Sequence, residues 1–593
     1  MSLSPPPADR RPTPDGPSPR AAVVARLLLL IGFTSITYAA SFEGAFHFDD
    51  YGTLHFNRAI RRLWPLDDYL TNSRPIAQWT FAVNYALHEL QPFGYHVVNL
   101  AIHVTCGTFL FGLVLSTHRL MFGGAAEERG LNLATLVAAI WLVHPLATQA
   151  VTYICQRYES LAALGYLGVL WLLSRAMVTG RVWRFLPGVL LLSWVGFLSK
   201  ETMATAPLAA WLYDWVFSRH AATRIRSRWP LYLAMLSPLV WFAPSVWRWV
   251  GPGAQSGAMG FGFKGATPWE YLRSQPEVLL HYLRLAVCPD RLCFDYGWMV
   301  QHDPWRIYGP GLVIVTLLLS GLWLLWRRRP LGWLIVTFFL ILAPTSSIVP
   351  IADLAVEHRM YLPLAAVVCG VALGAARLAG STTWGRWQPT CGSILTLVAV
   401  ATVPLLMWRT HLRNLDYTSG VRLWEQTLAA RPDNARAHLF FGMELHDAGR
   451  FAEAIPAFQE TLRLRRLNLT GEAYLGLGFC AFETRDWANA EQFLRAAITN
   501  KQRVGGAWAD FTIARAHNGL GGVYHEQRRI PESLVEFQQA ADLGLPDARY
   551  NAADAAERLG RYDEAMAGYE LLLEEQPQFT RAARRLAWLL AVR

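Results

Sequence analysis

Residues 21 to 410 contain a series of long apolar runs separated by short polar links, and this pattern restricts the fold more than any other feature of the sequence. A run of about 20 apolar residues can cross a bilayer as a helix, which satisfies its own backbone hydrogen bonds there. The sequence therefore predicts an all-α, polytopic membrane protein with about eleven spanning helices. We expect these helices at residues 21–40, 94–117, 131–150, 159–178, 183–199, 202–218, 229–249, 309–326, 331–348, 361–379 and 391–409.

Arginines in the links predict which way the chain crosses the membrane. They cluster at 175–184, 219–228 and 327–329, and all three clusters fall on the side of the N-terminus if the count of spans is right. The positive-inside rule makes that side the cytoplasm. The formal net charge of +10 is thus explained by topology, and no nucleic-acid partner is expected.

The same orientation divides the chain into domains. Proline-rich residues 1–20 are expected to form a disordered cytoplasmic tail. Residues 42–93 and 250–308 become outer loops of a membrane domain at 21–410, and the charged stretch 268–288 becomes an interfacial helix. The C-terminal region then lies outside, in the periplasm of a cell with an inner membrane.

Residues 416–593 have an ordinary soluble composition and repeat a short turn pattern. The pattern occurs at 448–454, 484–490, 527–533 and 559–565, each followed by a large aromatic residue. The spacings vary around the roughly 34-residue period of tetratricopeptide repeats. We expect a stacked helical solenoid whose concave surface binds peptide segments; the repeats could instead only stabilise or dimerise the protein.

Polar residues suited to chemistry gather in the links assigned to the outside. An acid pair follows the first apolar run, and acids at a membrane boundary are more often kept for chemistry than for stability. Each residue also has a plain structural explanation: a solvated loop for the acids, a helix-capping turn for His144, side chains reaching the interface for Lys200 and Glu201. Their confinement to one face favours a shared site. The candidates are Asp49, Asp50, Arg74, His144, Arg157, Glu159, Lys200, Glu201, His358, Arg359 and Tyr361, with Asp214 as a deeper partner.

Six motifs, taken in order, resemble the transmembrane-and-TPR-containing O-mannosyltransferases, whose bacterial relatives share the GT-C glycosyltransferase fold. The motifs are RPIAQWTFAVNY (74–85), PFGYHVVN (92–99), HP to RYE (144–159), LSKE (198–201), YLRLAVCP (282–289) and PTSS to HRMYLP (344–363). The resemblance implies a GT-C transmembrane domain with its acid motif in the first outer loop, here Asp49 and Asp50, and repeats on the active-site side. The chain departs from the family pattern at His358, which leaves the contribution of that residue open.

The residue types suit transfer of a sugar from a polyprenyl phosphate to an acceptor hydroxyl. Arg157, Lys200, His358 and Arg359 could neutralise the departing phosphate. A carboxylate could accept the proton of the attacking hydroxyl, which predicts an inverting displacement, and we favour Asp50 over Asp49 as this base.

Several alternatives stay open. The expected donor is a lipid-linked sugar in the membrane, and the expected acceptor is a protein Ser or Thr held by the repeats, with no cofactor required. A carboxylate pair could hold a divalent metal, but no second acidic cluster is committed to one, so no metal ligands are assigned. Cys288 and Cys293 could form a disulfide or act as small hydrophobic residues. A GT-C enzyme that modifies lipid A or an envelope polysaccharide, or a non-catalytic scaffold, are the competing functions; only the scaffold would not need the acid pair.

Overall fold

A computed structural model describes residues 19–70, 74–123, 127–218, 226–241, 260, 263, 265–379, 388–505 and 509–592. The expected tail at 1–20 lies almost entirely outside these residues. The described residues are all-helical and contain no β-strand, which confirms the predicted fold class. The chain divides into two compact units, one of residues 1–294 and 298–419 and the other of residues 295–297 and 420–593.

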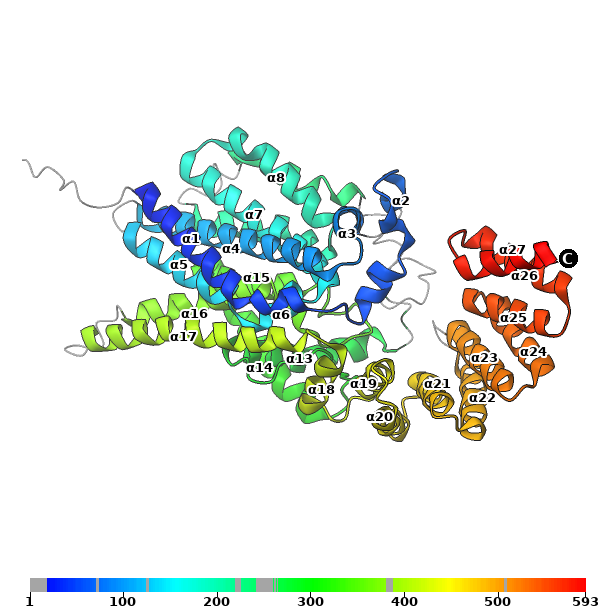
Figure 1. Ribbon diagram of the computed structural model, residues 1–593. Coiled ribbons are helices and arrows are strands. Elements are labelled where there is room, and N and C mark those ends of the chain that lie inside the picture. The colour runs from blue at the N-terminus through cyan, green and yellow to red at the C-terminus, as the bar shows by residue number, and fades with distance from the viewer. Residues whose placement is uncertain are drawn as a thin grey trace, which may run out of the picture. The chain divides into compact units, whose positions relative to one another are not determined.

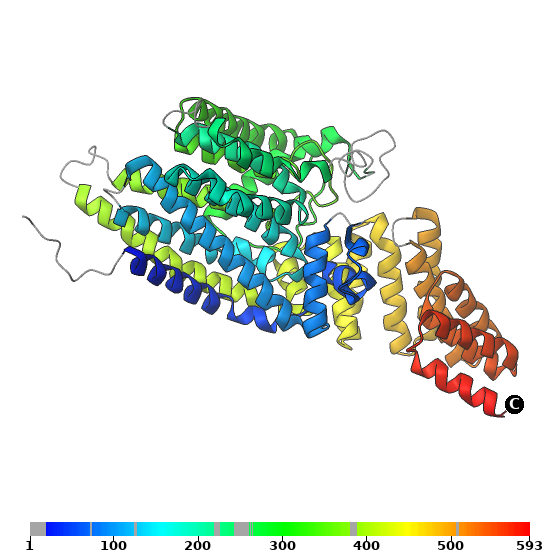
Figure 2. The same cartoon turned by 90° about the horizontal axis from the view of Figure 1, so that it is seen from above.

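The first unit is a bundle of apolar helices in which α4 packs between α5 and α7 (Figures 1 and 2). Its apolar helices are α1 (Pro19–Thr37), α4 (Pro92–Phe122), α5 (Glu127–Leu142), α6 (Thr148–Val151), α7 (Arg157–Thr179), α8 (Val182–Phe197), α9 (Ala206–Phe217), α11 (Trp229–Leu236), α14 (Pro304–Trp326), α15 (Pro330–Leu342), α16 (Pro363–Ala379) and α17 (Gln388–Asp416).

Four described segments are long and apolar enough to cross a membrane: Arg20–Thr37, Pro92–Phe122, Ile154–Thr179 and Pro304–Trp326. A fifth is obtained if Glu127–Leu142 and Pro145–Val151, bent by 55°, count as one span. The remaining apolar helices are shorter, so the described residues indicate a membrane protein without confirming eleven spans.

The first outer loop is folded, which its composition did not predict. It contains the short turns η1 (Ala39–Glu43), η2 (Tyr51–His55) and η3 (Arg58–Arg61), and the helices α2 (Asp67–Leu70) and α3 (Pro75–His88). Proline at the first position of α3 has no N–H to leave unsatisfied, so the helix begins there.

The charged stretch expected to form an interfacial helix is α13 (Pro268–Val287). Thr267 begins it with a capping box that includes Glu270. Buried Tyr271 donates to the Thr345 carbonyl at 2.6 Å, and Tyr282 donates to the Val356 carbonyl at 2.8 Å. The helix therefore fixes the chain segment that leads to η8 (Glu357–Met360).

The second unit consists of helices stacked in antiparallel pairs (Figure 2). They are α18 (Gly420–Ala430), α19 (Ala435–Asp447), α20 (Phe451–Arg463), α21 (Leu467–Glu483), α22 (Trp487–Val504), α23 (Ala509–Glu526), α24 (Ile530–Asp542), α25 (Pro546–Arg558), α26 (Tyr562–Glu575) and α27 (Thr580–Val592).

The predicted repeat turns share one backbone conformation. The second residue of each turn has a left-handed φ: 74° at Gly449, 61° at Arg485, 61° at Arg528 and 75° at Gly560. A left-handed residue commonly ends a helix and reverses the chain. The aligned turns thus mark four equivalent helix pairs, as the sequence predicted.

Candidate active site

The acid pair follows α1 and η1, and its two carboxylates have opposite surroundings. Asp50 is fully buried, and both of its oxygens accept backbone hydrogen bonds, Oδ2 from the His47 N–H at 2.9 Å and Oδ1 from the Cys155 N–H at 2.7 Å. Asp49 is exposed, and its own N–H donates to the Tyr153 hydroxyl at 2.8 Å. Asp50 thus holds the loop, and Asp49 is the carboxylate that a substrate can reach.

The backbone just before the pair is strained. Phe48 has φ of +40°, a conformation that residues with a side chain rarely adopt. Such strain persists only where the surroundings enforce it, and it gathers at functional sites. The two hydrogen bonds to Asp50 supply that enforcement.

Burial raises the pKa of Asp50 to about 7, although its backbone partners oppose the shift. The group therefore changes charge close to neutral pH. An ionised Asp50 is the form that accepts both N–H groups most strongly.

Residues 153–159, here called the anchor segment, connect the acids to the basic side chains. Tyr153 and Cys155 bind the acid pair as described, and the guanidinium of Arg74 stacks on the Tyr158 ring at 4.8 Å. Glu159, at the start of α7, accepts from Lys200 Nζ at 2.5 Å. One short stretch of chain thus positions groups from three other segments.

Arg157 also belongs to the anchor segment, but its guanidinium faces the protein. It is fully buried and donates to Asn99 Oδ1 at 2.6 Å, to the Tyr95 carbonyl at 3.1 Å, and to the carbonyl and hydroxyl of Thr80. It also stacks on the Phe81 ring at 4.6 Å. The structure gives Arg157 a positioning role in place of the phosphate contact expected from sequence.

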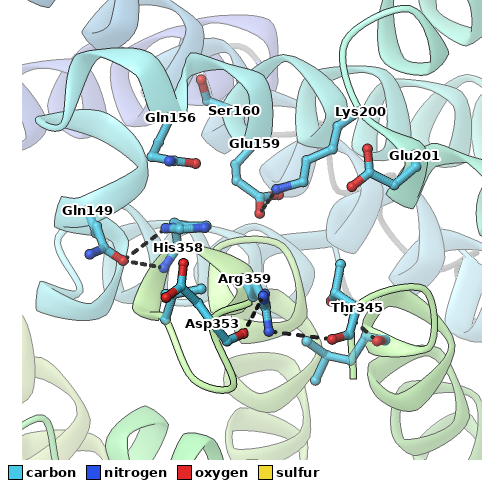
Figure 3. Close-up of polar contacts among 12 residues, drawn as sticks. Gln149, Gln156, Glu159, Ser160, Lys200, Glu201, Thr345, Asp353, His358 and Arg359 are labelled. Carbon is cyan, nitrogen blue, oxygen red and sulfur yellow. Dashed lines mark hydrogen bonds and ion pairs between the residues drawn. The ribbon is translucent and has the colours of Figure 1, made fainter. Parts of the chain in front are cut away.

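The basic side chains of Lys200, Arg359 and Arg74 all lie close enough to His358 to lower its pKa. Figure 3 shows Lys200 and Arg359 on either side of Glu159. Lys200 pairs with Glu159, and Arg74 approaches Glu201 at 3.4 Å. Burial alone would raise the pKa of Glu201, but Arg74 and Lys200 outweigh it and hold that pKa below its usual value. Arg74, Lys200, Glu159 and Glu201 therefore form one mixed charged cluster.

Arg359 completes the cluster from η8. Its guanidinium donates to the backbone carbonyls of Asp353 at 2.8 Å, Leu354 at 3.2 Å and Thr345 at 3.4 Å (Figure 3). Carbonyl oxygens orient the cation without cancelling its charge. Burial lowers the pKa of Arg359, but nearby groups that include the carboxylates of Asp353 and Glu159 raise it above its usual value, so the side chain stays charged.

His358 adds no charge to this cluster. Burial lowers its pKa well below the usual value, and Lys200, Arg359 and Arg74 lower it further. Its backbone N–H and Nδ1 both bind Gln149 Oε1, at 2.8 and 3.1 Å (Figure 3). The ring is therefore neutral, with Nδ1 as the donor and Nε2 as an acceptor.

His144 and Tyr361 are buried supports. Nδ1 of His144 accepts from the Leu146 N–H at 3.1 Å and caps the turn η5 (Pro145–Ala147), while Nε2 contacts the Ala286 carbonyl. The hydroxyl of Tyr361 bonds His103 at 2.8 Å. The helix-capping explanation of His144 is the one that the structure shows.

Asp214 does not join the site. It lies near the C-terminal end of α9, about two helical turns beyond the helix start. There it pairs with Arg228 at 2.5 Å and accepts from Tyr232 at 2.8 Å. The partners that the structure gives Asp214 are thus Arg228, Tyr232 and Ser218, which lie outside the cluster described above.

Sequence reasoning missed Tyr417, which follows α17. Its carbonyl accepts from the Ala45 N–H at 3.0 Å and binds Nε2 of His47 at 2.8 Å. Burial lowers the pKa of His47 to about 4, so the ring is neutral and Nε2 is the donor here. The segment that leads to the repeats is thus bonded to the loop of the acid pair. A carbonyl contact leaves no side-chain signal in a sequence.

The described residues contain no group of three or more His, Cys, Asp or Glu that could hold a metal ion. Cys288 is exposed and Cys293 is buried, and no disulfide joins them. Cys293 instead donates its backbone N–H to buried Glu357.

Comparison with known proteins shows repeats at the C-terminal end and sequence similarity over most of the chain. A family model described as tetratricopeptide repeat matches residues 405–464, 441–503 and 526–578. Protein O-mannosyl-transferase Tmtc3 of Drosophila melanogaster is 23% identical over 89% of this chain and 65% of its own length. Protein O-mannosyl-transferase F38B6.6 of Caenorhabditis elegans is 24% identical over 77% of this chain and 65% of its own. Human protein O-mannosyl-transferase TMTC1 is 25% identical over 78% of this chain and 57% of its own length.

The chain thus spans somewhat less than two thirds of the length of these relatives. Among solved structures, the APC/C hetero-tetramer Cut9–Hcn1 aligns with 88% of this chain and 91% of its own, at 13% identity and a TM-score of 0.26, which is too low to define a fold. By sequence, the chain is similar over most of its length to proteins named protein O-mannosyl-transferases, and its C-terminal unit carries tetratricopeptide repeats.

Proposed function

We propose that this chain is a GT-C membrane glycosyltransferase that moves a sugar from a polyprenyl phosphate to a Ser or Thr hydroxyl of a protein. The observation that carries the proposal is the attachment of an exposed carboxylate and a cationic cluster to one anchor segment. The names of the relatives support a sugar donor and a protein acceptor. The reaction takes place on the outer, periplasmic face of an inner membrane, where the links that carry the site are expected.

Arg74, Lys200 and Arg359 bind the donor phosphate. These three cations lie among the carboxylates of Glu159, Glu201 and Asp353, which hold them in place. Because these groups are largely removed from water, their attraction for the departing phosphate is stronger than on an open surface. Nε2 of the neutral His358 ring accepts a hydrogen bond from a hydroxyl of the sugar.

Asp49 acts as the base. We place this role at Asp49 and not at Asp50, because both oxygens of Asp50 are taken by backbone N–H groups. The acceptor oxygen attacks the anomeric carbon, its proton passes to Asp49, and the bond from that carbon to the phosphate oxygen breaks. The products are the glycosylated protein and polyprenyl phosphate, with inversion at the anomeric carbon.

Two buried ion pairs with the same 2.5 Å separation allow a matched test. Lys200–Glu159 lies in the proposed donor site, and Arg228–Asp214 lies outside it. Changing both members of a pair avoids a buried unpaired charge. The full-length chain, the Lys200→Met/Glu159→Gln variant and the Arg228→Met/Asp214→Asn variant are compared in lipid nanodiscs.

Binding of a radiolabelled polyprenyl-phosphate mannose and its transfer to a Ser/Thr peptide are measured. We expect the first variant to lose donor affinity at least about tenfold, the scale of one charge-assisted contact, and the second to retain it. Equal donor affinity in all three proteins would contradict the proposed donor site. Absence of transfer from every lipid-linked hexose by the unmodified chain would contradict the proposed reaction.

A further inference from the structure

The repeat unit contains a cavity of about 410 Å³ lined by α21, α23, α24 and α25. Four aromatic residues line it: Phe479, Phe482, Phe537 and Tyr550. Gly522 leaves it open toward Phe482, because a Cβ at that position would come within 3.2 Å of the Phe482 ring. The cavity is a built feature of the repeats, wide enough for one large side chain.

Acidic residues recur at the ends of three helices of the repeat unit, and two of them line this cavity. Asp447, Glu483 and Glu526 are the last residues of α19, α21 and α23. A carboxylate at a helix C-terminus opposes the helix dipole and costs stability, so the repetition is not explained by helix formation. Glu483 and Glu526 are exposed and line the cavity.

The charge of the lining is negative. Its twelve residues include Glu483, Glu526 and Asp554, with His525 as the only group that can become positive. His525 lies 3.9 Å from both Glu526 and Asp554, and Arg558, which is not part of the lining, pairs with Asp554 at 2.8 Å. The guanidinium of Arg515, which is not part of the lining, lies 5.0 Å from the centroid of the Phe479 ring. Carboxylates and aromatic rings that line one cavity favour a cation, and Phe482, Phe537 and Tyr550 are the rings considered for a ligand.

Two amides in the lining are arranged to hold a peptide bond. Asn551 Nδ2 donates to Asn518 Oδ1 at 2.9 Å, and both side chains are half-buried in the cavity wall. This contact uses one donor and one acceptor of the pair. The Asn518 amide and the Asn551 carbonyl retain a donor and an acceptor, which match the C=O and N–H of one peptide unit.

We propose that this cavity binds an extended peptide segment and takes up one of its Arg or Lys side chains. The cation contacts Glu483 and Glu526 over the aromatic rings, and the two asparagines hold the peptide backbone. This inference rests on the proposed function, in that the bound segment belongs to the acceptor protein. It predicts that acceptor proteins carry, at another position in the same segment, a basic residue besides the modified Ser or Thr.

The test uses the full-length chain in detergent and three fluorescent Ser/Thr peptides that differ at one central residue: Arg, citrulline or Glu. Citrulline keeps the shape of Arg and lacks its charge. We expect the Arg peptide to bind at least about tenfold more tightly than the citrulline peptide at low salt, and the Glu peptide to bind more weakly still. Glu483→Gln/Glu526→Gln should remove the preference for Arg.

Two controls separate a specific site from general attraction. Glu574→Gln, which removes an exposed acid outside the cavity, should leave the preference unchanged. Asn551→Ala should lower the affinity for the Arg and citrulline peptides by the same factor, because Asn551 contacts the backbone of the bound peptide. Equal affinity for the Arg and citrulline peptides, or a preference that survives the double variant, would overturn the inference.

Sugar transfer to a short, concentrated Ser peptide is measured in the same samples. Transfer without any Arg preference would reject the cavity assignment and leave the enzyme activity intact. An Arg preference without transfer would reject the proposed activity and leave the cavity assignment intact.

Discussion

Asp49 and Asp50 are neighbours in sequence with different tasks in the structure, and substitution by asparagine should separate them. Asp49→Asn should leave thermal stability unchanged and lower turnover by about a hundredfold or more, the scale of a general base. Asp50→Asn should lower both stability and turnover, since an amide nitrogen would face a backbone N–H. Melting curves and single-turnover transfer measure the two effects. If Asp49→Asn transferred sugar at the rate of the unmodified chain, Asp49 would not be the base.

The raised pKa of Asp50 predicts how stability depends on pH. An unfolded chain releases this proton near pH 4, whereas the folded chain keeps it until about pH 7. Between these values the folded state binds the additional proton, so the contribution of Asp50 to stability falls as pH rises and is constant above pH 7.

Apparent melting temperatures of the unmodified chain and of Asp50→Asn, taken from pH 5 to pH 8, check this dependence. The melting temperature of the unmodified chain should exceed that of Asp50→Asn by an amount that becomes smaller as the pH rises to about 7. Asp49→Asn serves as the control, because Asp49 is exposed. A constant difference over the whole range would show that Asp50 does not titrate there.

At this scale the sequence nominated residues for a site and left their exposure undetermined. Asp50 is buried because backbone N–H groups of His47 and Cys155 bind it, and the second lies 105 positions away. Arg157 is likewise saturated by partners from three other positions. Backbone donors and acceptors exist at nearly every residue, so no sequence pattern identifies the ones that are used.

The end of α17 ties the acid loop to the chain that enters the repeats, which gives an element-level prediction. A chain that stops after Ser419 retains the Tyr417 carbonyl and its bonds to Ala45 and His47, whereas a chain that stops after Asp416 lacks them. We expect both to bind the lipid donor. Only the longer one should transfer sugar to a small hydroxyl acceptor at a rate comparable with the full-length chain.

Both truncated chains lack every repeat, so they differ only by residues 417–419. In the full-length chain, His47→Gln retains an N–H donor for the Tyr417 carbonyl and His47→Leu does not, so the first should be the more active. Transfer rates on a small acceptor decide the outcome. Identical rates for the two truncations would mean that Tyr417 has no influence on the acid loop.

Hydrophobic patterning located the helices well and their interruptions poorly. The run expected as one span at 131–150 is divided into α5 and α6, because His144 and Pro145 form a capped turn between them. The folded first outer loop was also missed. Its helices are short and gain their stability from packing on other elements, which a local pattern does not report. The repeat turns were predictable because four copies of one turn reinforce the signal.

We predict the arrangement of the whole chain across the membrane from its arginines, and one native cysteine can test it. Cys288 is exposed and belongs to the segment expected as the second outer loop, so a membrane-impermeant maleimide should label it in intact cells. In a Cys288→Ser background, Asp510→Cys should also be labelled in intact cells. Arg181→Cys should react only after the membrane is permeabilised.

Cys288→Ser alone should show little labelling, because most of the other described cysteines are buried. Labelling of Arg181→Cys in intact cells would reverse the predicted orientation and move the site to the cytoplasmic face. The charge pattern of the sequence supports the predicted orientation.

The anchor segment has a genetic consequence. Seven consecutive residues carry the contacts of the acid pair, the buried guanidinium and the ion pair to Lys200, and the side chains of Tyr153, Arg157 and Glu159 make three of these four contacts. In a library of single substitutions selected for activity, residues 153–159 should form one short interval in which almost no replacement survives. The cavity of the repeats should instead accept many replacements that change which proteins are modified. Mutation would therefore alter the choice of acceptor far more readily than the reaction itself.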